Sequence, residues 1–181
     1  WVAVFGCGGV GLAAVITAAA AGARVVAVDV SPAALELALG FGAEVAVGAD
    51  VGDADQPHRA VREHTGGGAH LSVDALGSPA TCAAGIRSLR RRGRHVQVGL
   101  LPEALGDPAL PMAAVIGQEL EILGSHGMPA HDYPALLGLV ASGRLPVARL
   151  VTRRIGLADA VAALPAMGDP GQPAGVTVIE P

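Results

Sequence analysis

The first 23 residues carry no charged side chain, and five glycines interrupt them. An uncharged stretch of this length is long enough to cross a membrane. However, Gly8 and Gly9 in its middle would each weaken a continuous helix by about 1 kcal/mol relative to alanine. No basic cluster precedes the stretch and no small-residue cleavage pattern follows it, so a signal peptide is disfavoured as well. A strand, a tight turn and a helix explain the stretch better than a membrane segment.

Residues 6–11 read Gly-Cys-Gly-Gly-Val-Gly and match the spacing G-x-G-x-x-G. The motif alone is weak in a chain with 26 glycines. Its context is more specific, because it follows the β-prone run 2–5, opens an alanine-rich helix over 10–21, and precedes an apolar strand over 24–29. That strand ends in Asp29, eighteen residues after the last glycine of the motif. The combination predicts a dinucleotide-binding site.

Each residue of this glycine loop has an expected role. Gly6 permits the tight turn, Gly8 lets the backbone approach a pyrophosphate, and Gly11 lets the helix pack closely against the strand. Gly9 and Val10 lie at the start of the helix, where backbone N–H groups and the helix dipole attract phosphate.

Asp29 predicts which dinucleotide is bound. A carboxylate accepts hydrogen bonds from the adenosine ribose hydroxyls and repels a 2′-phosphate. Val30 and Ser31, which follow it, offer no positive charge to such a phosphate. The expected cofactor is therefore NAD rather than NADP.

Further apolar runs alternate with helical patterns. Strands are expected at 45–47, 71–74, 95–98 and 120–123, with helices after Ser31, around 60–64 and after Ser78. Both serines precede proline, the pattern of an N-cap and a first helical residue. The helix after Ser78 is expected to end in the arginines 90–92, where cations complement the helix dipole. Six strands alternating with helices predict an α/β fold with a doubly wound, six-stranded parallel sheet of the Rossmann type.

The pattern changes after Gly124. We expect residues 1–124 to form the nucleotide-binding domain. The segment 125–181 shows a helix at 132–141, a strand near Leu150, a helix from Ala158 and a strand at 175–179. It is too small to form a comfortable core of its own, so it is expected to complete another domain.

Loops after three later strands are expected to border the same crevice as the glycine loop, because ligands bind at the carboxyl ends of such strands. They supply more candidate cofactor-binding residues: Ala75 and Leu76, then Val98, Gly99 and Leu100, then Ser125 and His126. The alternative for each is an ordinary loop residue, and a lone loop histidine is more often simply solvated.

Composition excludes several other mechanisms. All twelve Lys and Arg positions are arginine, so the sequence contains no lysine. Mechanisms that need a P-loop lysine, a lysine Schiff base or a Tyr-x-x-x-Lys pair are therefore excluded for this sequence. A net charge of −4 is unfavourable for binding nucleic acid. Cys7 and Cys82 form neither a disulfide framework nor a metal motif, which suits a cytoplasmic protein.

Together these motifs resemble the cofactor-binding half and C-terminal segment of medium-chain, zinc-type alcohol dehydrogenases. The resemblance implies NAD-dependent transfer of hydride between a small alcohol or carbonyl and nicotinamide, with zinc as the Lewis acid. It also implies homodimers or homotetramers in which sixth strands pair near 120–123. The likeness extends over essentially the whole chain and is carried by 6–11, 28–29, 65–67, 73–77, 93–99 and 123–125.

The same family places its zinc ligands and proton relay in an N-terminal, barrel-like domain that precedes the part matched here. No catalytic residue and no zinc ligand can therefore be assigned in this sequence, and 125–181 is expected to belong to an incomplete catalytic domain. A basic residue that some members carry near the last strand is also missing, with Gly175 and Val176 near that place. We expect the chain to bind NAD and, by itself, to catalyse little.

Three other interpretations stay open. A zinc-free reductase of the quinone reductase type would differ in residues upstream, but such enzymes usually prefer NADP, which Asp29 disfavours. A nucleotide-binding module without catalysis would explain the missing catalytic half. A methyltransferase that binds S-adenosylmethionine is the most distant alternative.

Overall fold

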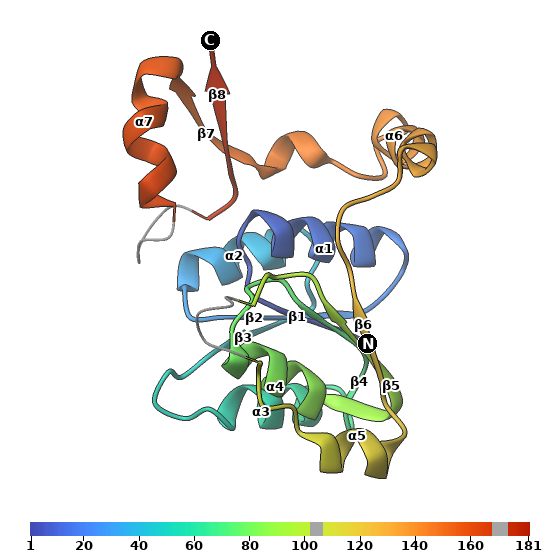
Figure 1. Cartoon of the computed structure of the whole chain (residues 1–181). Helices are drawn as coiled ribbons and strands as arrows, with labels where there is room; N and C mark the ends of the chain where they lie inside the picture. Colours follow the sequence, from blue (N-terminus) through green and yellow to red (C-terminus); the bar gives the residue numbers. More distant parts are fainter. Residues whose placement is uncertain (102–106, 168–173) are drawn as a thin grey trace.

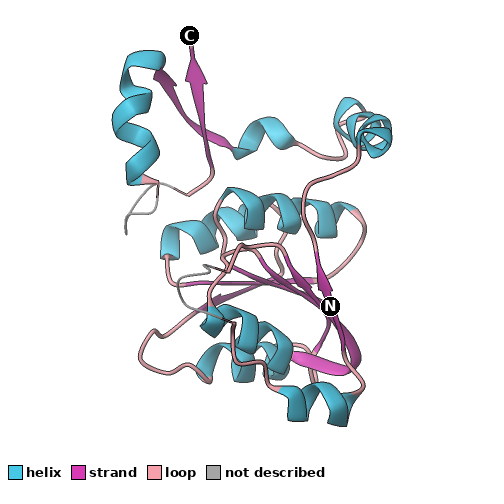
Figure 2. Ribbon diagram, viewed as in Figure 1, coloured by secondary structure: helices cyan, strands magenta, loops and turns pink. Residues whose placement is uncertain are grey.

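The computed structural model describes residues 1–101, 107–167 and 174–181. Figures 1 and 2 show a central sheet with helices on both faces, and a smaller sheet built from the C-terminal segment. Within the described residues, no helix has both the length and the apolar character needed to span a bilayer.

The central sheet is parallel and doubly wound, as the sequence predicted. Its order is β3-β2-β1-β4-β5-β6, so the direction of winding reverses between β1 and β4. A crevice for ligands is expected at the carboxyl ends of these two strands. The strands are β1 (Val2–Phe5), β2 (Val25–Asp29), β3 (Val45–Gly48), β4 (Ala69–Asp74), β5 (Leu89–Gln97) and β6 (Glu121–Gly124).

Helices cover both faces of this sheet. In Figure 2, α1 and α2 lie on one face and α3, α4 and α5 on the other. Ser31 and Ser78 cap α2 and α4 with their side chains, as expected from the Ser-Pro pairs. The helices are α1 (Gly9–Ala20), α2 (Pro32–Gly40), α3 (Gln56–His64), α4 (Pro79–Arg87) and α5 (Met112–Gln118).

The central strands bury side chains on both faces. Val4 packs into a cluster with Leu12 of α1, whereas its neighbour Phe5 packs into a second cluster with Val61 of α3. Two covered faces explain why β1 and β2 read as unbroken apolar runs without polar alternation. The glycine loop and Asp29 therefore extend from deeply buried strands.

The arginine cluster lies in a strand, so its assignment to a helix end was wrong. Helix α4 ends at Arg87, and residues 90–92 belong to β5. Arg91 and Arg92 each form a 2.7 Å ion pair with Glu119. The single carboxylate of Glu119, on the segment leading into β6, therefore pairs with two of these arginines, which do not lie at a helix end.

Element boundaries differ from the expectation in two other places. Helix α5 was not predicted, because it has only seven residues and its N-cap position, Pro111, supplies no side-chain cap. Helix α3 begins at Gln56, earlier than the expected residue 60, since a proline at its second position is compatible with a first turn.

The C-terminal segment packs over α1 and then forms its own two-stranded sheet. It contains η2 (Ala130–Asp132), α6 (Tyr133–Ala141), η3 (Val147–Leu150), β7 (Val151–Gly156), α7 (Leu157–Ala166) and β8 (Val176–Glu180). β7 and β8 are parallel neighbours. Leu145 and Leu150 are buried in the same cluster as the side chains of α1. The division into domains at 1–124 and 125–181 stays a prediction.

Candidate functional site

The glycine loop has the conformation that close contact with a phosphate requires. Gly6 has a φ of 87°, in the left-handed region that glycine tolerates best. A Cβ at Gly11 would overlap the carbonyl oxygen of Gly6, which shows how closely α1 approaches β1. A Cβ at Gly8, by contrast, would meet no atom within 4 Å. The space beside Gly8 is therefore open to a ligand.

The first turn of α1 presents unpaired backbone donors to this space. Gly8 is the N-cap residue, and no side chain caps the helix. The first turn also contains no acidic residue. The N–H groups of Gly9, Val10 and Gly11 and the positive end of the helix dipole are thus available to an anion.

Asp29 faces the glycine loop from the end of β2. Its Oδ2 accepts a 2.6 Å hydrogen bond from the N–H of Cys7, and its Oδ1 accepts one of 2.8 Å from the N–H of Ser31. A carboxylate offers about four acceptor positions, so capacity remains for two ribose hydroxyls. The two existing bonds fix the carboxylate beside the loop before any ligand arrives.

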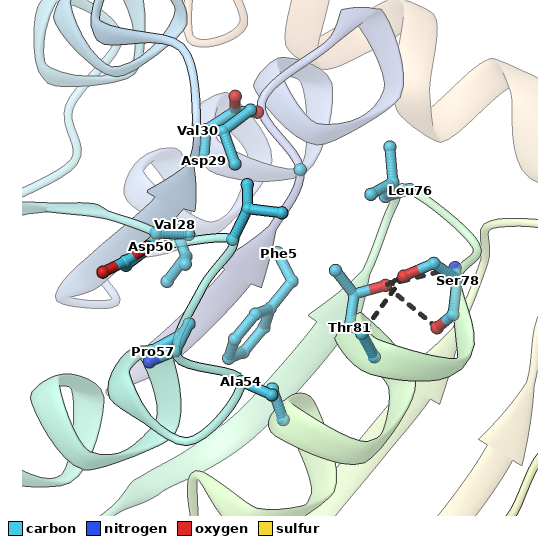
Figure 3. Close-up of a pocket in the computed structure, with 15 residues that line it drawn as sticks. Phe5, Val28, Asp29, Val30, Asp50, Ala54, Pro57, Leu76, Ser78 and Thr81 are labelled. Carbon is cyan, nitrogen blue, oxygen red and sulfur yellow. Dashed lines mark hydrogen bonds between the residues drawn. The ribbon is translucent and has the colours of Figure 1, made fainter.

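A cleft of about 300 Å³ lies next to Asp29, between the central strands and helices α3 and α4. Figure 3 shows Phe5, Val28 and Pro57 as apolar walls of this cleft, with Ser78 and Thr81 at one side. An apolar slot with a few polar groups suits a flat aromatic group such as a nucleobase.

A second cleft, of about 540 Å³, runs from the glycine loop to the C-terminal sheet. Cys7, Gly8 and Gly9 line one side, and residues of β7, α7 and β8 line the other. Contact across it is close, since a Cβ at Gly9 would lie 3.2 Å from Cγ2 of Val176. Asp29 and Leu76 line both clefts. The two therefore adjoin at the residue expected to hold the ribose.

The structure places the other candidates in a row along the carboxyl edge of the sheet. The loops after β4 and β5 touch, because a Cβ at Gly99 would lie 2.7 Å from Cα of Gly77. The N–H of Ser125 donates to the carbonyl of Gln97 at 3.0 Å, which brings the loop after β6 alongside. Of these candidates Leu76 lines the two clefts, whereas Ala75, Val98, Gly99, Leu100, Ser125 and His126 do not.

A buried carboxylate fixes the loop opposite the glycine loop. Asp74 is fully buried, and its Oδ1 accepts hydrogen bonds of 3.0 Å from the N–H groups of both Leu76 and Gly77. Its Oδ2 accepts from Thr81 at 3.0 Å and from Gln97 at 2.8 Å. Asp74 thereby accepts four hydrogen bonds, one of them from Leu76, and fixes the loop that carries Leu76.

Sequence reasoning missed two groups of cleft residues. The first follows β3 and reaches into α3, where Asp50, Val51 and Pro57 line the first cleft. The rule used for the other strands could have found it, since β3 lies beside β2 and ends at the same edge of the sheet. The second group belongs to β7, α7 and β8. No local motif marks these residues, because their position depends on how the C-terminal segment folds back.

Two further observations limit the chemistry that this site can perform. Burial, together with a smaller effect of the nearby Asp29 carboxylate, raises the pKa of Cys7 to about 12, so its thiol stays protonated. Among the residues that the structure describes, no group of three or more His, Cys, Asp and Glu side chains could hold a metal ion. The site as described is suited to binding a nucleotide.

Comparison with known proteins gives a consistent result. A family model described as "Zinc-binding dehydrogenase" matches residues 9–142. D-xylulose reductase A of Aspergillus oryzae is 34% identical over 162 residues, and a probable alcohol dehydrogenase of Mycobacterium tuberculosis is 38% identical over 164 residues. The alcohol dehydrogenase of the archaeon Aeropyrum pernix, a solved structure, superposes with a TM-score of 0.85 at 30% identity, covering 99% of this chain and 49% of that one.

The match covers most of this chain but less than half of each relative. In both sequence relatives the aligned part is 88% of this chain and 44% of the relative. The chain thus spans under half the length of the curated proteins it resembles.

Proposed function

The chain belongs to the zinc-binding dehydrogenase family, and on that basis we propose that it forms the NAD(H)-binding portion of an alcohol dehydrogenase-like oxidoreductase. Such an enzyme transfers a hydride between a small alcohol or carbonyl and the nicotinamide, and the bound cofactor supplies this redox chemistry. The relatives named as alcohol dehydrogenase and xylulose reductase support this class of reaction.

One observation carries the choice of cofactor: Asp29 stands where the two clefts adjoin. We propose that the adenine occupies the first cleft, that Asp29 accepts hydrogen bonds from the ribose, and that the pyrophosphate lies against Gly8 and the first turn of α1. The open space beside Gly8 fits a phosphate that approaches the backbone closely. A 2′-phosphate would lie against the carboxylate and be repelled, which favours NAD over NADP.

Zinc, which the family implies, finds no ligand set among the described residues. The proposed function therefore includes no step at a metal. What these residues do is bind and orient the cofactor.

We also propose a homodimer or a homotetramer. Strand β6 is at the edge of the sheet, and its residues Glu121–Gly124 are all exposed. An exposed strand edge offers unpaired backbone groups to a second strand, and pairing of two copies would satisfy them. Size-exclusion chromatography with light scattering would test this, since a monomer at micromolar concentration contradicts it. A cytoplasmic location remains part of the proposal, and the free, buried thiols of Cys7 and Cys82 suit it.

The cofactor assignment is tested by titrating the chain with NADH and with NADPH and following the fluorescence of the nicotinamide. We expect NADH to bind at least about 10-fold more tightly, a difference of about 1.4 kcal/mol. The variant Gly8→Val should lose this binding because its side chain fills the phosphate space. Gly117→Val is the matched control, since Gly117 on α5 also has open space around it. Equal affinity for NADPH would contradict the choice of NAD and favour a quinone reductase-like enzyme.

A further inference from the structure

Four polar side chains form a hydrogen-bonded row on the face of the central sheet that α4 covers. Ser72 and Asp74 belong to β4, and His95 and Gln97 are their paired positions on β5. Ser72, Asp74 and His95 are fully buried. The ring of His95 lies under α4, because a Cβ at Gly85 of that helix would be 2.8 Å from its Cε1. Burying polar groups costs free energy, so packing alone does not explain this row.

The amide of Gln97 determines which nitrogen of His95 carries a hydrogen. Its Nε2 donates to two acceptors, Oδ2 of Asp74 and the carbonyl of Gly99, each at 2.8 Å. Its Oε1 faces Nε2 of His95 at 3.2 Å and needs a donor, so the hydrogen is on that ring nitrogen. Nδ1 then accepts from the hydroxyl of Ser72 at 2.9 Å. A neutral ring makes all of these bonds.

The row ends at the loops that border the proposed cofactor site. Asp74 accepts a hydrogen bond from the N–H of Leu76, which lines both clefts, and one from Thr81, which lines the first (Figure 3). Gln97 is bonded to the loop after β5. His95 itself lines neither cleft. Its influence on a ligand must therefore pass through Gln97 and Asp74.

The surroundings of His95 favour the neutral ring. Burial lowers its pKa, although the bond to Gln97 and the charge of Asp74 act in the opposite direction. Among the described residues of the elements packed against the ring, Asp74 and Cys82 of α4 are the other buried titratable groups. The remaining charged or titratable side chains of these elements are not buried: His70, Arg87, Arg90, Arg91, Arg92, Arg94 and Glu121. Protonation would bury a charge and turn Nδ1 into a donor, so the hydroxyl of Ser72 would lose its acceptor.

We infer that His95 is a positioning residue for the cofactor, which acts through Gln97 to hold the loops after β4 and β5 in the arrangement that binding requires. The inference rests on the proposed function. Because this arrangement needs the neutral ring, ligand binding and protonation of His95 oppose each other.

The first test measures the affinity for ADP-ribose at pH 7.5 by isothermal calorimetry, with circular dichroism to show that each variant is folded. His95→Phe keeps a ring but has no donor for Gln97, whereas His95→Gln restores an N–H donor without a charge. Ser88→Ala is the matched control. Ser88 is fully buried and donates to the carbonyl of Gly85 at 2.7 Å, but it precedes β5, at the end of the sheet away from the clefts.

We expect His95→Phe to weaken ADP-ribose binding by about 5-fold or more, the range for a buried group left without its partner. His95→Gln and Ser88→Ala should both stay within about 2-fold of the unmodified chain. Unchanged affinity in a folded His95→Phe, or an equal loss in Ser88→Ala, overturns the inference.

A second measurement needs no loss of a side chain. NMR follows the ring of His95 through a pH titration with and without saturating ADP-ribose, and the spectrum of His95→Gln identifies its signals. We expect the ligand to move this titration to lower pH, which corresponds to at least about 3-fold tighter binding by the chain with the neutral ring. The exposed His131 is the control and should titrate identically in both samples.

A His95 titration that the ligand does not move overturns the inference, even if His95→Phe fails to fold. If the unmodified chain binds ADP-ribose but the His95 variants behave like the control, the proposed function stands and the role of His95 does not. If the unmodified chain binds no ADP-ribose, the proposed function fails and the inference fails with it.

Discussion

Gln97 donates a 2.8 Å hydrogen bond through Nε2 to Oδ2 of the buried Asp74, and this bond joins the ends of β5 and β4. The same amide also donates to the carbonyl of Gly99 at 2.8 Å. Gln97 and Asp74 together fix the two loops that lie opposite the glycine loop. The position of Leu76 in the cleft depends on this pair.

Asp74→Ala should destabilise the fold by about 3 kcal/mol or more, because buried donors that now bond to the carboxylate would be left without a partner. The free energy of unfolding in urea measures this loss. Asp107→Ala is the control, since Asp107 is exposed, and it should change the free energy by less than about 0.5 kcal/mol. A loss at Asp74 no larger than at Asp107 would show that the bonds contribute little.

His95 predicts how stability depends on pH. Burial lowers the pKa of this histidine below 6.5, although its bond to Gln97 and the charge of Asp74 act in the opposite direction. Between the folded pKa and 6.5 the unfolded chain binds more protons than the folded one, so stability rises with pH. The contribution of neutral His95 to the free energy of unfolding is complete above pH 6.5 and is lost as the pH falls through the pKa of the folded state.

We therefore expect the unfolding free energy to decrease from pH 7.5 to pH 5.5, and His95→Gln to reduce that slope. His58 and His70 add to the same slope, because burial lowers the pKa of each of them too. His131→Gln, on an exposed residue, is the control and should keep the full slope. If His95→Gln and the unmodified chain show the same slope, His95 does not contribute to the pH dependence of stability.

Gly11→Ala should cost about 2 kcal/mol or more, because its Cβ would overlap the carbonyl oxygen of Gly6 and force α1 away from β1. Chemical denaturation measures the effect. Gly117→Ala, in the open space around α5, should be neutral or stabilise the chain by up to about 1 kcal/mol. Equal behaviour of the two variants would mean that the close helix–strand contact is not required.

Cys7 should resist alkylation at pH 8, because burial raises its pKa to about 12 and leaves almost no thiolate. Iodoacetamide labelling followed by mass spectrometry measures the modified fraction. Labelling should become complete in urea, where the thiol is exposed. Rapid labelling of the folded chain would show that the glycine loop opens often.

The sequence was sufficient to predict the central sheet, because glycine spacing, Ser-Pro caps and unbroken apolar strands all act locally. It was insufficient for Arg91 and Arg92, since a run of arginines is compatible with a helix end or a strand until Glu119 is placed beside it. The cleft residues of β7, α7 and β8 were missed for a similar reason. Their position results from folding of the C-terminal segment onto the glycine loop, which no spacing in the sequence encodes.

Val176 of β8 lies close to Gly9, since a Cβ at Gly9 would be 3.2 Å from its Cγ2, so two segments far apart in the sequence meet at one site. During synthesis the glycine loop emerges before β8, so the cleft has only one of its two walls until β8 has been translated. The central sheet can form before then, since its strands all precede residue 125. A nucleotide that binds both walls would therefore act late in folding, by stabilising the final closure of the C-terminal sheet.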